Sequence, residues 1–224
     1  MSAAAGKLSL EQIRRLPKTE LHTHLDGCLR PSTLIDLAKK DSVLLPNAAA
    51  PGETPSEKEL QDILLPPNGT SSLVEFLQAF SYTLPVLQNT TALQRVLREM
   101  AEDYAADGIS YLEIRFCPDL HTDKGCSNEE ILRAACEESR RVTREALAQL
   151  ENGLKEGEAP LPVTRILVCG LRHMEPHYAT ALAELTVRLA KEEAETLPVA
   201  DRQIAGFDLA GKSSKMLIPG DASN

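Results

Sequence analysis

Strand-like and helix-like segments alternate along most of this chain, and no other feature constrains its fold as strongly. Amphipathic runs with apolar residues three and four apart predict helices between the strands. Strands joined by helices form right-handed βαβ units and a parallel sheet. The sequence therefore predicts an α/β fold, a partial (β/α)8 TIM-type barrel with about four βα units, where a closed barrel has eight. The predicted strands lie within residues 17–27, 109–117, 163–171 and 204–211.

A helical insertion, at about residues 41–106, follows the first predicted βα unit. Its first part, residues 41–70, contains five prolines and predicts a long surface segment with a short helix at 57–64. Helical spacing returns at residues 72–88 and 91–106. We therefore expect three parts in the chain: an N-terminal extension (1–15), a half-barrel domain that carries the insertion (16–211) and a C-terminal tail without a strand–helix pattern (212–224).

Composition disfavours several classes of function. Lys and Arg total 24 and Asp and Glu total 33, for a net charge of −9, and this excess of negative charge repels nucleic acids and anionic membranes. No run approaches the ~20 apolar residues of a membrane helix, and no secretory signal is visible. The five cysteines form no Cys-x-x-Cys pair, which indicates reduced thiols. We expect a cytoplasmic protein without nucleic-acid or membrane partners.

The tripeptide His22-Thr23-His24 is the strongest local signal of chemistry. Residues two apart on a strand share a face, so both imidazoles would point to the same side, where they are well placed to bind one divalent metal ion. In a barrel, that side is the interior, below the rim where barrel active sites lie. Strict alternation predicts Glu20, His22, His24 and Asp26 on the interior side, and Leu21, Thr23 and Leu25 under the helices.

The segment around this tripeptide resembles the opening signature of the adenosine deaminase family, zinc hydrolases of the amidohydrolase barrel superfamily. It reads Leu-Pro-Lys-Thr-Glu-Leu-His-Thr-His-Leu-Asp-Gly and ends at Gly27. Three later segments match the family in order. They read Gly108-Ile-Ser-Tyr-Leu-Glu-Ile-Arg-Phe-Cys-Pro118, Gly170-Leu-Arg-His173 and Gly206-Phe-Asp-Leu-Ala-Gly211. Because four motifs occur in register, the resemblance extends over about residues 16–211.

The resemblance implies a function and a set of site residues. It implies a cofactor, Zn2+, with His22 and His24 as two metal ligands, and hydrolysis of adenosine to inosine and ammonia by a zinc-activated water. It also implies substrate contacts from His24, from Asp26 towards ribose and from the backbone of Gly211 near the purine, where glycine permits a close approach. The implied partner is a small purine nucleoside; adenine and N6-methyl-AMP are alternative substrates among relatives.

The chain departs from the family pattern after its fourth predicted strand. The family's His-Ala-Gly-Glu segment, which carries the third zinc histidine and the acid/base glutamate, is absent, so no catalytic residue is assigned here. We therefore expect a truncated chain with weak or no activity, or alternatively a catalytically dead fragment that serves as an interaction module. Half a barrel would also leave unpaired strand edges, which predict self-association.

Three further residues, Glu20, His173 and His121, are assessed from the sequence alone. Glu20 either orients an imidazole from the second shell or forms a buried pair with Arg115. His173, at the rim of the third strand, is either a pocket residue or a structural histidine. His121, in a loop, is predicted to be solvated.

Overall fold

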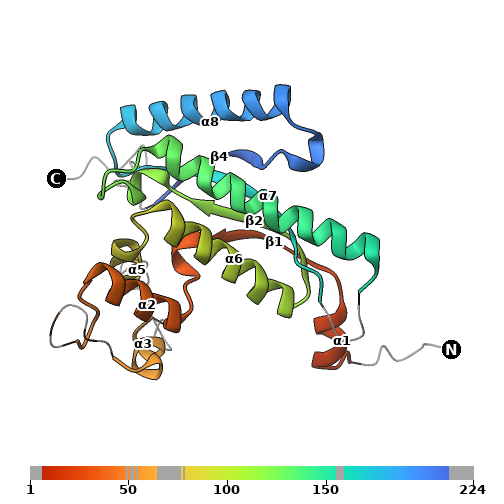
Figure 1. The fold of residues 1–224 in the computed structure, drawn as a ribbon, viewed down its shortest axis with the longest axis horizontal. Helices are drawn as coiled ribbons and strands as arrows, with labels where there is room; N and C mark the ends of the chain where they lie inside the picture. Colours follow the sequence, from red (N-terminus) through yellow and green to blue (C-terminus); the bar gives the residue numbers. More distant parts are fainter. Residues whose placement is uncertain are drawn as a thin grey trace, which may run out of the picture.

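Four parallel strands form the sheet of the computed structural model, which describes residues 7–48, 50, 53, 55–64, 77, 79–154 and 159–211. The strands lie side by side in the order in which they occur in the chain (Figure 1). Parallel neighbours require a crossover between them, and this arrangement confirms the predicted α/β architecture. The strands are β1 (Lys18–His24), β2 (Ile109–Phe116), β3 (Val163–Leu171) and β4 (Ile204–Ala210).

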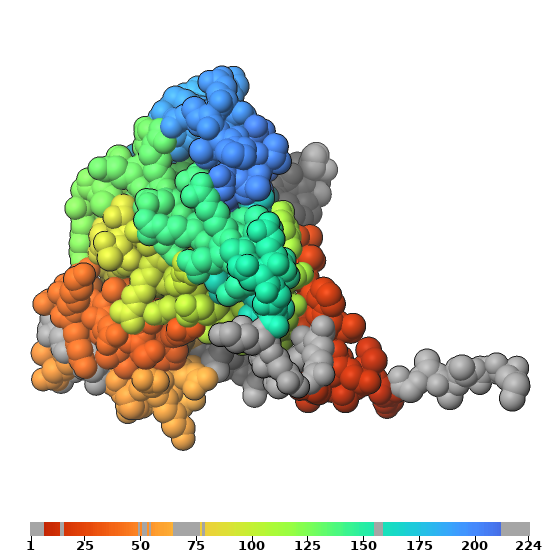
Figure 2. All heavy atoms as spheres, turned by 45° about the vertical axis from the view of Figure 1, so that its right-hand side comes forward, coloured from red at the N-terminus to blue at the C-terminus, as the bar shows by residue number. Residues whose placement is uncertain are grey.

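Helices fill the crossovers and the insertion. In Figure 2, α2 and α3 form one end of the molecule and α8 and β4 the opposite end. No helix in the described ranges is both long and apolar enough to cross a membrane. The helices are α1 (Leu10–Arg15), α2 (Pro31–Asp41), α3 (Glu57–Leu64), α5 (Phe80–Thr83), α6 (Thr90–Ala106), α7 (Asn128–Asn152) and α8 (Pro176–Thr196), with short 3-10 turns η1 (Leu25–Gly27), η2 (Leu84–Val86), η3 (Pro118–His121) and η4 (Val199–Asp201).

The two faces of the sheet differ in burial. Leu112 and Ile114 of β2 and Ile166 of β3 are fully buried, on the face along which α6, α7 and α8 pack (Figure 1). Each such side chain stabilises the fold by roughly 1.5–3 kcal/mol. The opposite face, which we call the open face, carries Glu113 and Arg165, a register pair that is half-buried. The open face is the one on which polar chemistry can take place.

The insertion agrees with the sequence where it is described. The short predicted helix occurs as α3, with the expected bounds, and it packs against α2. The second predicted helix occurs as α6, which covers β2. Much of the helix predicted at 72–88 lies outside the described residues, and the part that is described forms α5 and η2. The tail, 212–224, also lies outside them.

A β-bulge interrupts β1 and changes the faces predicted by strict alternation. Glu20 pairs with Leu112 of β2 and Thr23 pairs with Ile114, so Leu21 and His22 together occupy the place opposite one residue, Glu113. The extra residue shifts the alternation by one position. The predictions for Glu20 and Leu21 were therefore wrong: Glu20 pairs with a residue of the helix-covered face, and Leu21 is 52% exposed.

Candidate active site

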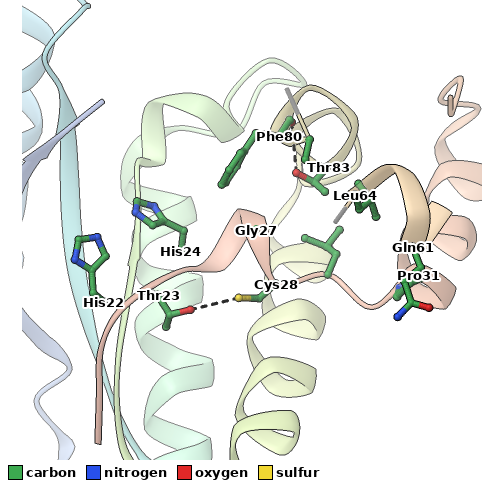
Figure 3. Close-up of a pocket in the computed structure, with 12 residues that line it drawn as sticks. His22, Thr23, His24, Gly27, Cys28, Pro31, Gln61, Leu64, Phe80 and Thr83 are labelled. Carbon is green, nitrogen blue, oxygen red and sulfur yellow. Dashed lines mark hydrogen bonds between the residues drawn. The ribbon is translucent and has the colours of Figure 1, made fainter. Parts of the chain in front are cut away.

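A cavity of about 460 Å³ lies at the carboxyl end of β1 (Figure 3). The strand and the turn after it supply one wall, and the insertion supplies the opposite wall. Parallel α/β folds place ligand sites at this end of their strands. The cavity is lined by His22, Thr23, His24, Gly27, Cys28, Leu29, Pro31, Gln61, Leu64, Ala79, Phe80 and Thr83.

The two histidines of β1 lie together on the wall of this cavity. Their ring centroids are 5.6 Å apart and the rings are tilted by 46°. Two imidazoles bound to one tetrahedral zinc ion have centroids roughly 5 Å apart, given a Zn–N distance of about 2.0–2.1 Å. The pair therefore fits two ligand positions of a zinc site. Within the described residues, no group of three or more His, Cys, Asp or Glu side chains could hold a metal ion.

Burial and neighbouring charges act on His24. Desolvation lowers the pKa of its imidazole, and nearby His22 and Arg115 lower it further, while Asp208 opposes them. Its register partner on β2 is Arg115, which places His24 on the open face. Phe80 contacts the ring edge-on, with centroids 6.4 Å apart. A lowered pKa keeps the imidazole neutral near pH 7, and a neutral imidazole is the form that binds metal ions.

Thr23, between the two histidines, faces the other way and anchors β1. It is only 7% exposed, and its hydroxyl lies 2.8 Å from the hydroxyl of Tyr104 on α6. The Sγ atom of Cys28 lies 3.4 Å from the hydroxyl oxygen of Thr23, and a dashed line in Figure 3 marks this contact. The Tyr104 contact fixes β1 against α6 at the position between the two histidines.

Asp26 lies in η1, two residues beyond His24, and is 4% exposed. Desolvation raises the pKa of its carboxyl group to about 6. Its Oδ1 atom is buried and finds no hydrogen-bond partner among the described residues. A buried oxygen without a partner is costly, and a hydroxyl of a bound molecule would satisfy it. Asp26 is, however, not among the residues that line the cavity of His22 and His24.

Gly211 follows β4 and adopts a left-handed backbone, with φ of 89°. A Cβ atom at this position would lie 3.0 Å from Nδ1 of His173. The two residues therefore meet at the rim, after the ends of β3 and β4, and His173 is exposed there. Gly211 does not line the cavity of the histidine pair either. Its backbone conformation and the His173 ring both favour glycine at this position.

An ion pair that was not predicted from the sequence crosses the open face beside the histidines. Nη1 of Arg115 on β2 donates to Oδ2 of Asp208 on β4 at 2.7 Å. Nη2 of Arg115 donates to the carbonyl oxygen of Leu21 on β1 at 3.1 Å. One side chain thus connects β1, β2 and β4. The carboxylate that binds Arg115 is that of Asp208. Glu20 was the partner considered from the sequence. Its side chain instead accepts a hydrogen bond from the backbone N–H of His22 at 2.8 Å.

His121 is buried, so the prediction of a solvated loop histidine was wrong. Its exposed fraction is 0%, and its Nδ1–H donates to the carbonyl oxygen of Leu87 at 2.9 Å. The ring packs edge-on against Phe116, with centroids 5.6 Å apart. Burial lowers its pKa to about 4. This hydrogen bond therefore joins η3 to Leu87, which directly follows η2 and the part of the insertion that lines the cavity.

Comparison with known proteins identifies what this chain resembles. A family model described as adenosine deaminase matches residues 17–217. A probable adenosine deaminase of Dictyostelium discoideum is 42% identical over 206 residues, which are 92% of this chain and 22% of that protein. The chain spans about half the length, or less, of the curated relatives that it matches.

Solved structures share the fold at lower identity. The apo N6-methyl-AMP deaminase of Arabidopsis thaliana matches with a TM-score of 0.60 and 23% identity, over 91% of this chain and 52% of that one. An amidohydrolase of Burkholderia ambifaria, described with bound Zn, matches with a TM-score of 0.63 and 18% identity, over 94% and 49% of the two chains. These likenesses confirm the predicted partial (β/α)8 TIM-type barrel.

Proposed function

This chain belongs to the adenosine deaminase family, and from that premise we propose that it provides the first-strand part of a zinc site for the hydrolytic deamination of adenosine to inosine and ammonia. The observation that carries the proposal is the pairing of His22 and His24, 5.6 Å apart, on the wall of a cavity at the carboxyl end of β1. Both the chemistry and the spacing of these donors suit zinc.

His22 and His24 would hold the metal ion in this proposal. Bound zinc would supply an activated water for attack on the purine ring. His24, half-buried and kept neutral by desolvation, would also contact the substrate. The structural neighbour with bound Zn supports the choice of metal. The described residues supply no third ligand, so the proposal assigns this chain two of the positions around the metal.

The residues that line the cavity favour an uncharged nucleoside over a nucleotide as the substrate. Among the described residues that line the cavity, none is a lysine or an arginine. A phosphate group binds strongly to cationic side chains. The apolar outer wall, which includes Leu64 and Phe80, suits a purine ring instead. Adenosine is therefore the leading substrate and adenine the first alternative, while N6-methyl-AMP, the substrate named for the Arabidopsis neighbour, fits less well.

Asp26 and Gly211 would contact the rest of the substrate. The buried Oδ1 atom of Asp26 lacks a partner among the described residues, and a ribose hydroxyl could donate to it. Gly211 presents its backbone at the rim without a side chain that would keep a purine away. Neither residue lines the cavity, so their roles require the substrate to reach beyond it.

The decisive experiment compares inosine formation by the purified, zinc-supplied chain with that of His22→Ala and His24→Ala variants. His177→Ala, which removes an exposed histidine of α8, is the matched control. Turnover, or zinc-dependent binding of adenosine, that the first two substitutions abolish and the third leaves intact supports the proposal. If the chain neither turns over nor binds adenosine in the presence of zinc, the interaction module becomes the better interpretation.

We also propose that the chain associates with itself through its outer strands. Within the described part of the chain, β1 and β4 each pair with a strand on one side only. Free strand edges offer unpaired N–H and C=O groups to another chain. Light scattering after size exclusion tests this proposal: a mass above the monomer value that rises with concentration supports it, and a monomer at all concentrations contradicts it.

A further inference from the structure

The bulge in β1 decides which way the two histidines face. Before the bulge, Glu20 pairs with Leu112, a fully buried residue of the helix-covered face. Strict alternation from Glu20 would place His22 and His24 on that same covered face. The extra residue reverses the alternation, so that Thr23 takes the covered face and His24 pairs with Arg115 on the open face. The histidine pair reaches the cavity because the bulge exists.

The bulge affects the peptide unit between Leu21 and His22. The bulge interrupts the regular pairing of β1 with β2 at Leu21 and His22, and the peptide unit between these residues carries the C=O of one and the N–H of the other. A bulge disrupts the ladder locally, and the polar groups of a peptide unit that leaves the ladder need other hydrogen-bond partners. The bulge therefore needs partners for this unit from outside the ladder.

Two charged side chains bind the two ends of this peptide unit. Oε1 of Glu20 accepts from the N–H of His22 at 2.8 Å, and Nη2 of Arg115 donates to the C=O of Leu21 at 3.1 Å. Hydrogen bonds with one ionised partner are about twice as strong as neutral ones. Arg115 is itself fixed, being 8% exposed and paired with Asp208.

We infer that Glu20 and Arg115 are positioning residues that stabilise the β1 bulge and thereby aim His22 and His24 together at the open face. Neither contacts a substrate or a metal in this role; both act through the backbone of the residues that would hold the ion. The inference rests on the proposed function for the use of the histidines, whereas the bulge itself can be tested without a metal.

The first test measures the bulge directly. Hydrogen exchange of the His22 amide, followed by NMR on the full chain, should be at least about tenfold faster in Glu20→Ala than in the unmodified chain, because the amide loses its acceptor. Glu20→Gln, which keeps a weaker acceptor, should fall between them. Glu113→Ala, which removes a carboxylate bonded to Tyr111 and not to β1, should leave the rate unchanged. Equal exchange in Glu20→Ala and the unmodified chain would overturn the inference.

The second test measures the consequence for the histidines. Co2+, used as a spectroscopic probe of the zinc site, should bind roughly tenfold more weakly to Glu20→Ala and to Arg115→Met, as expected when groups that orient metal ligands are removed. Arg115→Lys should recover part of this affinity, since one amine can replace only one of the two bonds. Arg165→Met is the control, because Arg165 occupies the same face on β3 and donates to its own neighbour, Thr164.

The two tests separate failure of this inference from failure of the proposed function. A purely structural role would lower the unfolding midpoint of Arg115→Met without changing the Co2+ affinity of the folded protein, and that result contradicts the inference. If the unmodified chain binds no Co2+, the proposed metal site is wrong, and amide exchange at His22 alone decides whether Glu20 holds the bulge.

Discussion

Arg115 and Asp208 form an ion pair that spans the sheet from β2 to β4, passing over β3, with 2.7 Å between Nη1 and Oδ2. The arginine side chain is 10% exposed and the aspartate side chain 41% exposed. The contact therefore combines a largely buried cation with an anion that water still reaches. Its loss would leave the guanidinium partly unpaired next to the candidate metal ligands.

Asp208→Asn should lower the free energy of unfolding by about 1–2 kcal/mol, less than for a fully buried pair because Asp208 is partly solvated. Urea denaturation measures the difference. Glu192→Gln is a suitable comparison, because Glu192 pairs with Arg133 where both side chains are 45% exposed, and a smaller loss is expected there because water screens the pair. Equal losses for the two substitutions would show that burial of Arg115 adds nothing.

His121 should make the protein less stable in acid. Its pKa is about 4 in the folded state, against 6.5 for the unperturbed group, so the unfolded chain takes up a proton first as the pH falls. The stabilisation is complete above pH 6.5 and is lost between pH 6.5 and about 4, by roughly 3 kcal/mol. The unfolding free energies of the unmodified chain and His121→Gln should therefore converge over this interval; a pH-independent difference would contradict the prediction.

Gly211→Ala should destabilise the rim for two separable reasons. The left-handed φ of 89° costs an alanine about 1–2 kcal/mol, and the new methyl group would meet His173 at 3.0 Å. Gly125→Ala isolates the first cost, because Gly125 has a similar φ of 95° with nothing within 4 Å of the added atom. The unfolding free energy should fall further for Gly211→Ala, and adding His173→Ala should remove the excess.

Phe80→Ala should raise the pKa of His24. Desolvation is the largest cause of the lowered value, and Phe80 packs edge-on against the ring, so its removal would admit water. NMR titration of the histidine ring protons gives the pKa directly. Leu77→Ala, which shortens an exposed side chain just before the same segment, should leave it unchanged. An unchanged His24 pKa in Phe80→Ala would contradict this prediction and show that residues other than Phe80 keep water away from the imidazole.

Local signals in the sequence predicted most of the regular structure. The capping box at Ser127 and Glu130 marks the start of α7; the sequence carries this signal because the hydrogen bonds of a capping box involve residues close in the chain. The bulge in β1 could not be predicted in the same way, since a period-two pattern assumes an unbroken ladder. Glu20 and Leu21 were placed on the wrong faces for this reason.

Contacts between distant segments were also beyond the sequence pattern. His121 reads as a loop residue, and only the fold brings the carbonyl of Leu87, 34 residues earlier, to its ring. Arg115 and Asp208 are 93 residues apart, and either could have paired elsewhere on the open face. The histidine pair was accessible to sequence reasoning because its two members belong to one strand.

The cavity has two walls of different origin. The histidines belong to β1, a strand of the sheet, whereas Leu64 and Phe80 come from the excursion between α2 and α6. A mutation in that excursion reshapes the ligand's surroundings without moving the strand that would hold the ion. Reactivity and molecular discrimination are thus encoded in separate stretches of the gene, and selection could adjust one while leaving the other intact.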